Sequence, residues 1–253
     1  MSSEPVADSI QGKVALVTGA AGVLGLATTR SLLDQGVRVV MNDIQPERLN
    51  ALAATLGEHA LAAPFDISNP EDVARQCARI RSEWGPVDIL VNNAGILSNH
   101  KAEETSPREW RQVLATNLDG AFFLSSVLLP DMKSRRWGRI INTCSLAGKT
   151  GGITAGTAYA TSKGAMQSLT FSLARETAAF GITVNGIAPA YVRTPMVMEQ
   201  LTEAQRTELL KTIPVGRFCE PEEFAHVVKF LTSPLAGFIT GEIIDLNGGL
   251  HFD

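Results

Sequence analysis

The sequence has few cysteines and no evident cysteine pair. Three occur, far apart and without a Cys-x-x-Cys motif: Cys77, Cys144 and Cys219. This pattern argues against a disulfide framework and a thiolate metal site, and it indicates free thiols in a reducing cytosol. The four histidines are scattered without metal-ligand spacing, so we expect no bound metal.

Basic runs and long apolar runs are also missing. A net charge of −4 and a pI near 5.6 argue against nucleic acid or an anionic membrane as the main partner. No apolar stretch approaches the length of a membrane span. Residues 1–9 are polar and lack the apolar core of a secretion signal, so we expect a flexible N-terminal tail. The sequence therefore predicts a cytoplasmic protein.

Short β-rich runs alternate with longer helical segments through most of the 253 residues. Strands are predicted at 14–18, 37–42, 60–65, 87–91, 139–143, 183–187 and 243–246. Helices are predicted at 23–35, 46–57, 70–84, 107–134, 157–180 and 220–232. Most strands are continuous apolar runs, as expected when helices cover both faces of a parallel sheet. We predict one Rossmann-type α/β domain over residues 10–253, with a doubly wound seven-stranded parallel sheet.

Residues 190–218 break this alternation. They contain Thr194-Pro195-Met196-Val197-Met198, then a helix-compatible stretch and Ile213-Pro214. An insertion after a strand of such a sheet lies near the carboxyl ends of the strands, where ligands bind. We expect a lid over the substrate, and an inert surface excursion is the alternative.

A glycine-rich segment, Thr18-Gly19-Ala20-Ala21-Gly22-Val23-Leu24-Gly25, follows the first predicted strand and opens a helix. Glycines at such a turn let a pyrophosphate approach the amides of a helix N-terminus. The position between a strand and a helix makes this a stronger signal than the glycines alone. We predict that a dinucleotide contacts Gly19, Gly22, Leu24 and Gly25.

Asp43 ends the second predicted strand, eighteen residues after Gly25. A carboxylate there can accept hydrogen bonds from the adenosine ribose hydroxyls and would repel a 2′-phosphate. Ile44 and Gln45 follow, and the glycine-rich segment holds no Arg or Lys to offset that repulsion. The sequence therefore predicts NAD rather than NADP.

Tyr159 and Lys163 stand four residues apart, so they lie on one face of a predicted helix. An ammonium one turn from a phenol stabilises the phenolate and makes the phenol a usable proton-transfer group near neutral pH. The pair alone is weak, because Tyr-x-x-x-Lys occurs by chance on many exposed helices. Ser145, fourteen residues before Tyr159, and Asn117 complete an ordered set that favours a catalytic interpretation.

These segments together resemble the single-domain branch of the short-chain dehydrogenase/reductase family, over nearly the whole chain. Asn92-Asn93-Ala94-Gly95, after the fourth predicted strand, matches a specific motif of that family. The resemblance implies that Ser145 hydrogen-bonds the substrate oxygen and Tyr159 exchanges a proton with it. It also implies that Lys163 keeps the phenol reactive and binds the nicotinamide ribose, while Asn117 holds a water that links the lysine to solvent.

The resemblance assigns further cofactor contacts. It implies that the adenine ring is held by Asp66 and Ile67, and that Asn93, Ala94 and Gly95 border the adenosine ribose. The nicotinamide is assigned to Val192 and Thr194, beside Tyr159 and Lys163.

The sequence departs from the family pattern at two positions. Val23 stands where the single-domain branch usually has glycine, and Ala190 replaces the glycine of a usual Pro-Gly pair. We expect Val23 to point away from the pyrophosphate, with Gly22 as the flexible residue. Ala190 can follow the same path if its φ is negative.

The resulting prediction is an NAD-dependent oxidoreductase that transfers a hydride between nicotinamide and a secondary alcohol or ketone. The resemblance further implies a homotetramer packed through residues 107–134 and 157–180. Side chains that could serve as contact or as core are Leu124, Val127, Phe171 and Leu173. The small-molecule substrate stays open between sugar, polyol, hydroxy acid, steroid and acyl thioester. Predicted pocket residues are Leu97, Ser98, His100, Leu146, Ile153, Tyr191 and Met196–Met198.

The sequence also bears on alternative functions, which it favours less. The spacing Gly19-x-x-Gly22-x-x-Gly25 is also typical of nucleotide-sugar epimerases and dehydratases, but these normally append a substrate domain, for which the chain leaves little room. A non-catalytic NAD(H)-sensing protein is the other alternative, although the complete catalytic set argues against it. A serine hydrolase is disfavoured because no Gly-x-Ser-x-Gly motif is present.

The role of Arg193 in the predicted site is open. It is a candidate ligand for an anionic substrate group or a surface residue.

Overall fold

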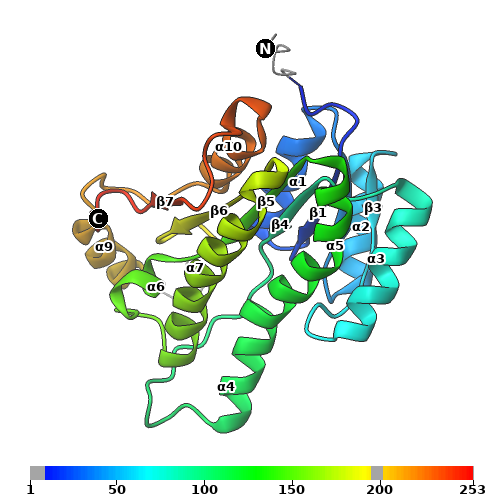
Figure 1. Cartoon of the computed structure of the whole chain (residues 1–253). Helices are drawn as coiled ribbons and strands as arrows, with labels where there is room; N and C mark the ends of the chain where they lie inside the picture. The colour runs from blue at the N-terminus through cyan, green and yellow to red at the C-terminus, as the bar shows by residue number, and fades with distance from the viewer. Residues whose placement is uncertain (1–8, 195–201, 253) are drawn as a thin grey trace.

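A seven-stranded parallel sheet forms the centre of the molecule (Figure 1). The computed structural model describes residues 9–194 and 202–252. The strands are β1 (Val14–Thr18), β2 (Arg38–Asn42), β3 (Ala60–Ala62), β4 (Ile89–Asn92), β5 (Gly138–Thr143), β6 (Ile182–Pro189) and β7 (Ile243–Leu246). They lie in the order β3-β2-β1-β4-β5-β6-β7, and every neighbouring pair is parallel. The predicted doubly wound fold is confirmed.

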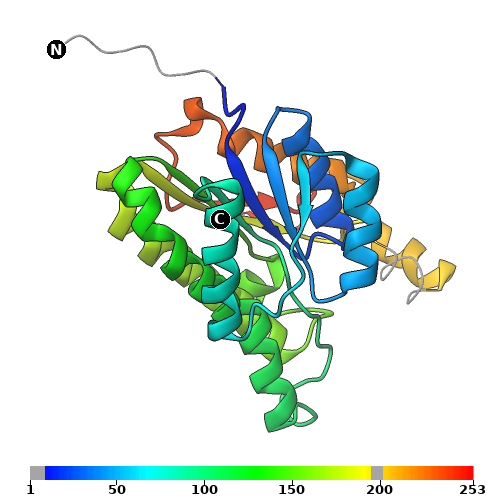
Figure 2. The same cartoon turned by 90° about the vertical axis from the view of Figure 1, so that its right-hand side faces the viewer.

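Helices cover both faces of the sheet, and Figure 2 shows a layer on each side of the strands. One layer contains α1 (Val23–Leu33), α2 (Pro46–Leu56) and α10 (Pro221–Thr232). The other contains α3 (Pro70–Trp84), α5 (Gly120–Arg135) and α7 (Thr157–Thr177). Three further helices follow the carboxyl ends of strands: α4 (Pro107–Leu114), α6 (Leu146–Thr150) and α9 (Glu203–Thr212).

The burial of β1 on both faces of the sheet explains why its sequence is almost entirely apolar. Val14 and Leu16 pack in the cluster with α3, α5 and α7, whereas Ala15 and Val17 pack in the cluster with α1, α2 and α10. Side chains alternate across a strand, so a sheet covered on both faces needs apolar residues at every position. The continuous runs found in the sequence are a consequence of this double burial.

The strand order reverses at β1, which pairs with β2 on one side and β4 on the other. In open parallel sheets, ligands bind outside the carboxyl ends of the strands at such a reversal. The glycine-rich segment follows β1, and residues 93–95 follow β4. The fold therefore brings both segments to the place where a nucleotide is expected.

Strand β3 is shorter than predicted and ends at Ala62 instead of Phe65. Pro64 lacks the N–H that a continuing ladder needs, and β3 is an edge strand paired only with β2. The side chain of Asn42 replaces that ladder, since its Nδ2 donates to the carbonyls of Ala63 and Phe65 at 3.2 and 3.0 Å.

Two predicted helices are less regular than expected. The helix predicted at 107–134 contains a π-helical turn, Ala115–Asp119, between α4 and α5. The helix predicted at 157–180 leaves α-helical geometry after Thr177 and ends in a 3₁₀ turn, Ala178–Phe180. The short helix α6 was not predicted, because five residues carry too little periodicity to be recognised in a sequence.

The combined helix Pro107–Arg135 is long and apolar enough, by length and composition alone, to cross a membrane. Its buried residues Leu124, Leu128 and Met132 belong to the cluster between the sheet and α3. This packing is that of a core helix in a globular domain.

Candidate active site

The glycine-rich segment is tightly folded against the residues that follow β4. Gly19 has a φ of 63°, and a Cβ placed on it would lie 2.9 Å from the Cα of Ala94. A Cβ on Gly25 would lie 2.2 Å from the carbonyl oxygen of Gly19. Neither position has space for a side chain, whereas the half-buried Val23 is the first residue of α1. Gly22 precedes that helix without a side-chain cap, so an anion such as pyrophosphate fits at its N-terminus.

Asp43 lies directly beside this segment. Its Oδ2 accepts a hydrogen bond from the amide of Ala21 at 3.2 Å, and its Oδ1 accepts from the amide of Gln45 at 3.1 Å. Each carboxylate oxygen has further acceptor capacity. The carboxylate is thus held next to the glycine turn, where ribose hydroxyls would be within its reach.

Thr18 and Asn93 join the ends of β1 and β4. The Oγ1 of Thr18 accepts hydrogen bonds from the amides of Asn93 and Ala94 at 2.9 and 3.0 Å. Asn93 Nδ2 donates to the carbonyls of Thr18 and Gly19 at 2.9 and 3.3 Å. The predicted ribose-binding segment therefore also supports the turn of the glycine loop.

The predicted adenine pair follows β3. Asp66 accepts hydrogen bonds on Oδ1 from the amide and hydroxyl of Ser68, at 2.9 and 2.7 Å. Ile67 is buried with 7% of its surface exposed and packs closely on Gly120 of α5. Asn92, at the end of β4, is buried and donates to Asn142 Oδ1 at 2.9 Å, which is a structural contact between β4 and β5.

Tyr159 and Lys163 both lie in α7, as predicted. The Nζ of Lys163 is 5.8 Å from the centroid of the Tyr159 ring and donates to the carbonyl of Thr143 at 2.6 Å. Lys163 is buried, with 3% of its surface exposed. An ammonium has three donors, so this buried group retains capacity to bind further oxygen atoms beside the phenol.

Asn117 lies in the π-helical turn and connects three parts of the site. Its Oδ1 accepts from the amide of Ile96 at 2.8 Å, and its Nδ2 donates to the Ile96 carbonyl at 3.0 Å. Nδ2 also donates to the Oγ of Ser162 at 3.0 Å. Gly95 lies against both Asn117 and Lys163. The segment after β4, the π turn and α7 therefore meet at one place.

Ser145 follows β5 and caps α6. Its Oγ accepts a hydrogen bond from the amide of Ala147 at 3.2 Å, which leaves the hydroxyl hydrogen able to donate. The adjacent Cys144 is fully buried, and burial raises the pKa of its thiol to about 11. Cys144 is therefore a neutral, buried packing residue at pH 7.

Comparison with known proteins places this arrangement in a family. The family model of short chain dehydrogenases matches residues 13–205. The chain belongs to the short-chain dehydrogenase family. It is 39% identical over 244 residues to the 3-oxoacyl-(acyl-carrier-protein) reductase FabG of Vibrio cholerae, covering 96% of this chain and 99% of the relative. It is also 39% identical over 247 residues to nodulation protein G of Azospirillum brasilense, covering 95% and 98%.

A solved structure agrees with this assignment. The crystal structure of a short-chain dehydrogenase/reductase from Brucella melitensis, named as a glucose/ribitol dehydrogenase, superposes with a TM-score of 0.89 at 33% identity. The match covers 97% of this chain and 99% of that structure. The chain is accordingly an oxidoreductase of a family that binds a nicotinamide cofactor.

The segment after β6 carries the predicted nicotinamide contacts of this short-chain dehydrogenase. Val192 is buried and forms an isolated bridge with Cys219, while the Tyr191 carbonyl accepts from the Cys219 amide at 3.2 Å. The positive φ falls on Tyr191, at 47°, and not on Ala190. The backbone at Ala190 therefore meets the condition stated for an alanine at this position, a φ that is not positive. Thr194 ends this described stretch, and Met196–Met198 lie outside the described residues.

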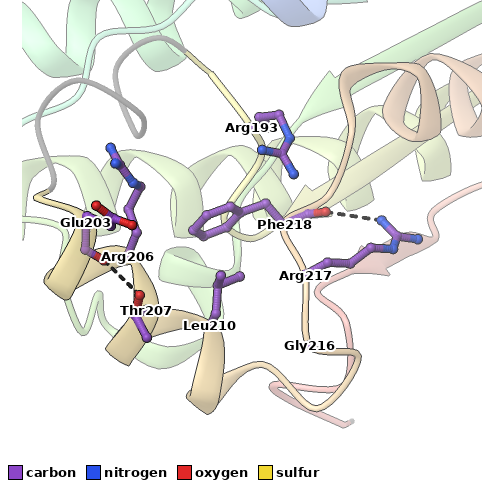
Figure 3. Close-up of a pocket in the computed structure, with 8 residues that line it drawn as sticks. All are labelled: Arg193, Glu203, Arg206, Thr207, Leu210, Gly216, Arg217 and Phe218. Atoms are coloured by element: carbon purple, nitrogen blue, oxygen red, sulfur yellow. Dashed lines mark hydrogen bonds between the residues drawn. The ribbon is translucent and has the colours of Figure 1, made fainter.

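Arg193 is engaged by an acidic residue. Its Nε lies 2.8 Å from the Oε1 of Glu220 in an exposed ion pair. Arg193 also borders a pocket of about 430 Å³ between α9 and residues 216–218. Figure 3 shows the Phe218 ring pointing into this space between Arg193 and Leu210. The residues that line the pocket include none of the predicted catalytic group.

Sequence reasoning did not identify Ser162 or the Thr143 carbonyl. Ser162 Oγ donates to the Tyr159 carbonyl at 2.7 Å and accepts from Asn117, so it links α7 to the π turn. Ser162 lies inside the Tyr159-x-x-x-Lys163 motif, so the sequence offers a signal by which it could have been identified. The Thr143 carbonyl, by contrast, is a backbone group with no sequence signal.

Proposed function

We propose that the chain is an NAD-dependent dehydrogenase or reductase that interconverts a secondary alcohol and a ketone. The observation that carries this proposal is the meeting of Tyr159, Lys163 and Asn117 at the carboxyl ends of the strands. Ser145 follows the neighbouring β5, and the uncapped glycine turn opens at the same edge of the sheet.

Each side chain has a distinct proposed role. The nicotinamide cofactor supplies or accepts the hydride when bound. Ser145 donates a hydrogen bond to the substrate oxygen, and Tyr159 gives a proton to that oxygen or takes one from it. Lys163 places its ammonium 5.8 Å from the centroid of the Tyr159 ring, and its proposed role is to stabilise negative charge that develops on the phenol oxygen during proton transfer. Asn117 holds the segment after β4 in place through Ile96, and its proposed further role is to support a water that connects Lys163 with solvent.

The cofactor proposal rests on Asp43 and on the glycine turn at the N-terminus of α1. Pyrophosphate would lie at the N-terminus of α1, with Gly19, Gly22, Leu24 and Gly25 around it. Asp43 would accept from the ribose hydroxyls and repel a 2′-phosphate, which favours NAD. Asp66, Ile67, Asn93, Ala94 and Gly95 would border the adenosine, and Val192 and Thr194 the nicotinamide.

The substrate class we propose to test first is a 3-oxoacyl thioester or its 3-hydroxy form. Support comes from relatives named 3-oxoacyl-(acyl-carrier-protein) reductase, at 36–39% identity over nearly the whole chain. Exposed apolar side chains at Leu97 and Ile153 are consistent with an acyl chain. A polyol is the second candidate, favoured by the similarity to the Brucella protein named as a glucose/ribitol dehydrogenase.

We further propose a cytoplasmic homotetramer in which α5 and α7 form contacts, and a substrate lid within residues 190–218 of the domain 10–253. Residues 1–8 of the predicted tail and residues 195–201 of the predicted lid lie outside the described residues. Leu124 and Leu173 are core residues, whereas Phe122, Val127 and Phe171 are 49%, 39% and 50% exposed. These exposed side chains on α5 and α7 would be covered by a partner subunit.

The deciding experiment follows absorbance of the reduced cofactor. Ketone reduction is measured with acetoacetyl thioester and NADH or NADPH, and alcohol oxidation with a panel of polyols and hydroxy acids. Turnover with NADH that is lost in Tyr159→Phe would support the proposal. Tight NADH binding without turnover across the panel would instead favour the sensing function.

A further inference from the structure

Helix α7, which carries Tyr159, is capped by another loop. The N-cap residue Gly156 has no side-chain hydrogen bond to offer, and amides in the first turn have no partner within a helix. Here the Gly156 amide donates to the Ser98 carbonyl at 2.7 Å, and the Thr157 amide donates to the His100 carbonyl at 3.0 Å. Tyr159 is the third residue of α7 and lies in the turn that these two bonds stabilise.

The two segments are in close contact. A Cβ on Gly156 would lie 2.4 Å from the His100 carbonyl oxygen, so only glycine allows this approach. Figure 1 shows the loop between β4 and α4 running past the start of α7. The position of that loop therefore decides whether the first turn of α7 is capped.

Lys101 ties this loop to the residues before α7. Its Nζ donates to the carbonyls of Gly152 and Ala155 at 3.2 and 2.7 Å. These acceptors are 51 and 54 residues away in the sequence. The ammonium of Lys101 thus holds the loop after β4 against the turn that leads into Gly156.

Glu109 fixes the same loop from α4. Its Oε1 accepts from the hydroxyl of the buried Ser98 at 2.6 Å, and its Oε2 lies 2.9 Å from Nδ1 of His100. The Ser98 hydroxyl and then the His100 ring hold the pKa of the Glu109 carboxyl below its usual range. Ser98 and His100 are the residues whose carbonyls cap α7, so Glu109 holds their side chains while α7 holds their backbone.

The Glu109 side chain binds Ser98 and His100 instead of closing the capping box of its own helix, α4. Ser106-x-x-Glu109 has the sequence of a capping box, and Ser106 Oγ does accept from the Glu109 amide at 3.1 Å. In α9 and α10 the corresponding Gln205 and Glu223 side chains close the box by accepting from the N-cap amide. In α4, Glu109 points to Ser98 and His100.

We propose that Lys101 and Glu109 are positioning residues that hold the first turn of α7, and with it Tyr159, in the arrangement needed for proton transfer. The inference rests on the catalytic role proposed for Tyr159. The loop is fixed at Ile96 by Asn117 and at residues 98–101 by Glu109 and Lys101, so the second anchor controls the end nearest α7. The cofactor site around Gly19 is separate from these contacts.

The position of Tyr159 can be observed without measuring activity. The chain has two tyrosines, Tyr159 and Tyr191, so protein labelled with fluorotyrosine gives one fluorine resonance for each. Tyr159→Phe assigns them. Spectra are compared for the wild type, Lys101→Met and Glu109→Ala, for the conservative variants Lys101→Arg and Glu109→Gln, and for the control Glu103→Ala, an exposed residue of the same loop.

We expect the Tyr159 resonance to shift or broaden in Lys101→Met and Glu109→Ala, while the Tyr191 resonance stays in place. With acetoacetyl thioester as substrate, kcat should fall about tenfold, because misplacement of a reacting group by about an ångström reduces rates strongly. The Kd for NADH should stay within about twofold, since the cofactor loop is untouched. Lys101→Arg and Glu109→Gln should recover most of the rate, and Glu103→Ala should match the wild type.

An unchanged Tyr159 resonance in both Lys101→Met and Glu109→Ala would overturn the inference, whether or not the enzyme turns over. An altered resonance with unchanged kcat would also overturn it, because the contacts would then not reach the chemistry. If the wild type reduces no ketone while the Tyr159 resonance responds to both substitutions, the proposed function fails and the positioning contacts stand.

Discussion

The ammonium of Lys163 donates to the carbonyl oxygen of Thr143 at 2.6 Å. This hydrogen bond joins α7 to the end of β5, two residues before Ser145. It therefore sets the relative position of the helix that carries Tyr159 and the strand that leads to Ser145. Lys163 has an architectural role here as well as the electrostatic one proposed for it.

Replacing Lys163 with methionine keeps most of the side-chain volume but removes the charge and the hydrogen bond. We expect kcat for ketone reduction to fall by about 100-fold or more, which is the range for losing support of a general acid–base group. The measurement is steady-state NADH oxidation at saturating cofactor. Lys229→Met, at an exposed position of α10, is the matched control. Full activity in Lys163→Met would show that Tyr159 needs no ammonium beside it.

Asp43→Asn separates the charge of this residue from its shape. An asparagine oxygen can still accept from the Ala21 amide, so the glycine turn should keep its form. The repulsion of a 2′-phosphate is lost, and the ratio of kcat/KM for NADH over NADPH should fall about tenfold. Glu47→Gln, an exposed residue in the first turn of α2, serves as control. An unchanged ratio, or a wild type that prefers NADPH, would contradict the assignment of Asp43.

The ion pair between Arg217 and Glu223 should make stability depend on pH. Hydrogen bonds from Arg217, and then from the Glu220 amide, hold the pKa of Glu223 at about 2, below its ordinary value of 4.5. The folded state thus favours the ionised carboxylate, so the stabilisation is present above pH 4.5 and is lost as the pH falls toward 2. Glu223→Gln should therefore lower stability at pH 7 and have little effect near pH 2.

The magnitude of this effect should be small because both side chains are partly exposed, at 50% and 39%. Surface pairs contribute about 1 kcal/mol or less, because solvent screens the two charges. Urea unfolding at several pH values measures it, with Glu222→Gln as the neighbouring control. A stability difference between Glu223→Gln and wild type that is constant from pH 7 to pH 2 would contradict the coupling.

Features that depend on local sequence could be predicted. The apolar runs identify the strands, the place between a strand and a helix identifies the glycine turn, and the four-residue spacing identifies Tyr159 and Lys163. These signals are local because helices and turns are determined by residues a few positions apart. Because an apolar run is also a local signal, β1 and β7 match their predicted bounds, Val14–Thr18 and Ile243–Leu246.

Features that depend on distant contacts could not be predicted. The acceptors of Lys101 are 51 and 54 residues away, and Asn117 meets Ser162 across 45 residues. The π turn at Ala115–Asp119 has no periodic signature in the sequence. A lysine in a loop and a glutamate at the third position of a helix are ordinary residues until the fold shows which carbonyls and side chains they meet.

The glycine turn offers a last prediction, because the roles of Gly25 and Val23 can be tested separately. A methyl group at Gly25 would lie 2.2 Å from the Gly19 carbonyl, so Gly25→Ala must displace backbone. We expect NADH affinity to fall by about 100-fold or the protein to lose about 1–3 kcal/mol of stability, as overpacking does. Val23→Gly should change the Kd for NADH by less than about tenfold, since valine already begins α1 and Gly22 supplies the flexible position. Fluorescence titration of NADH measures both affinities, and unfolding curves separate a loss of stability from a loss of affinity.

Two results would contradict these expectations. A Val23→Gly variant that binds NADH far more tightly would mean that the valine obstructs the pyrophosphate. A Gly25→Ala variant with unchanged affinity and stability would mean that the turn is less constrained than its geometry requires.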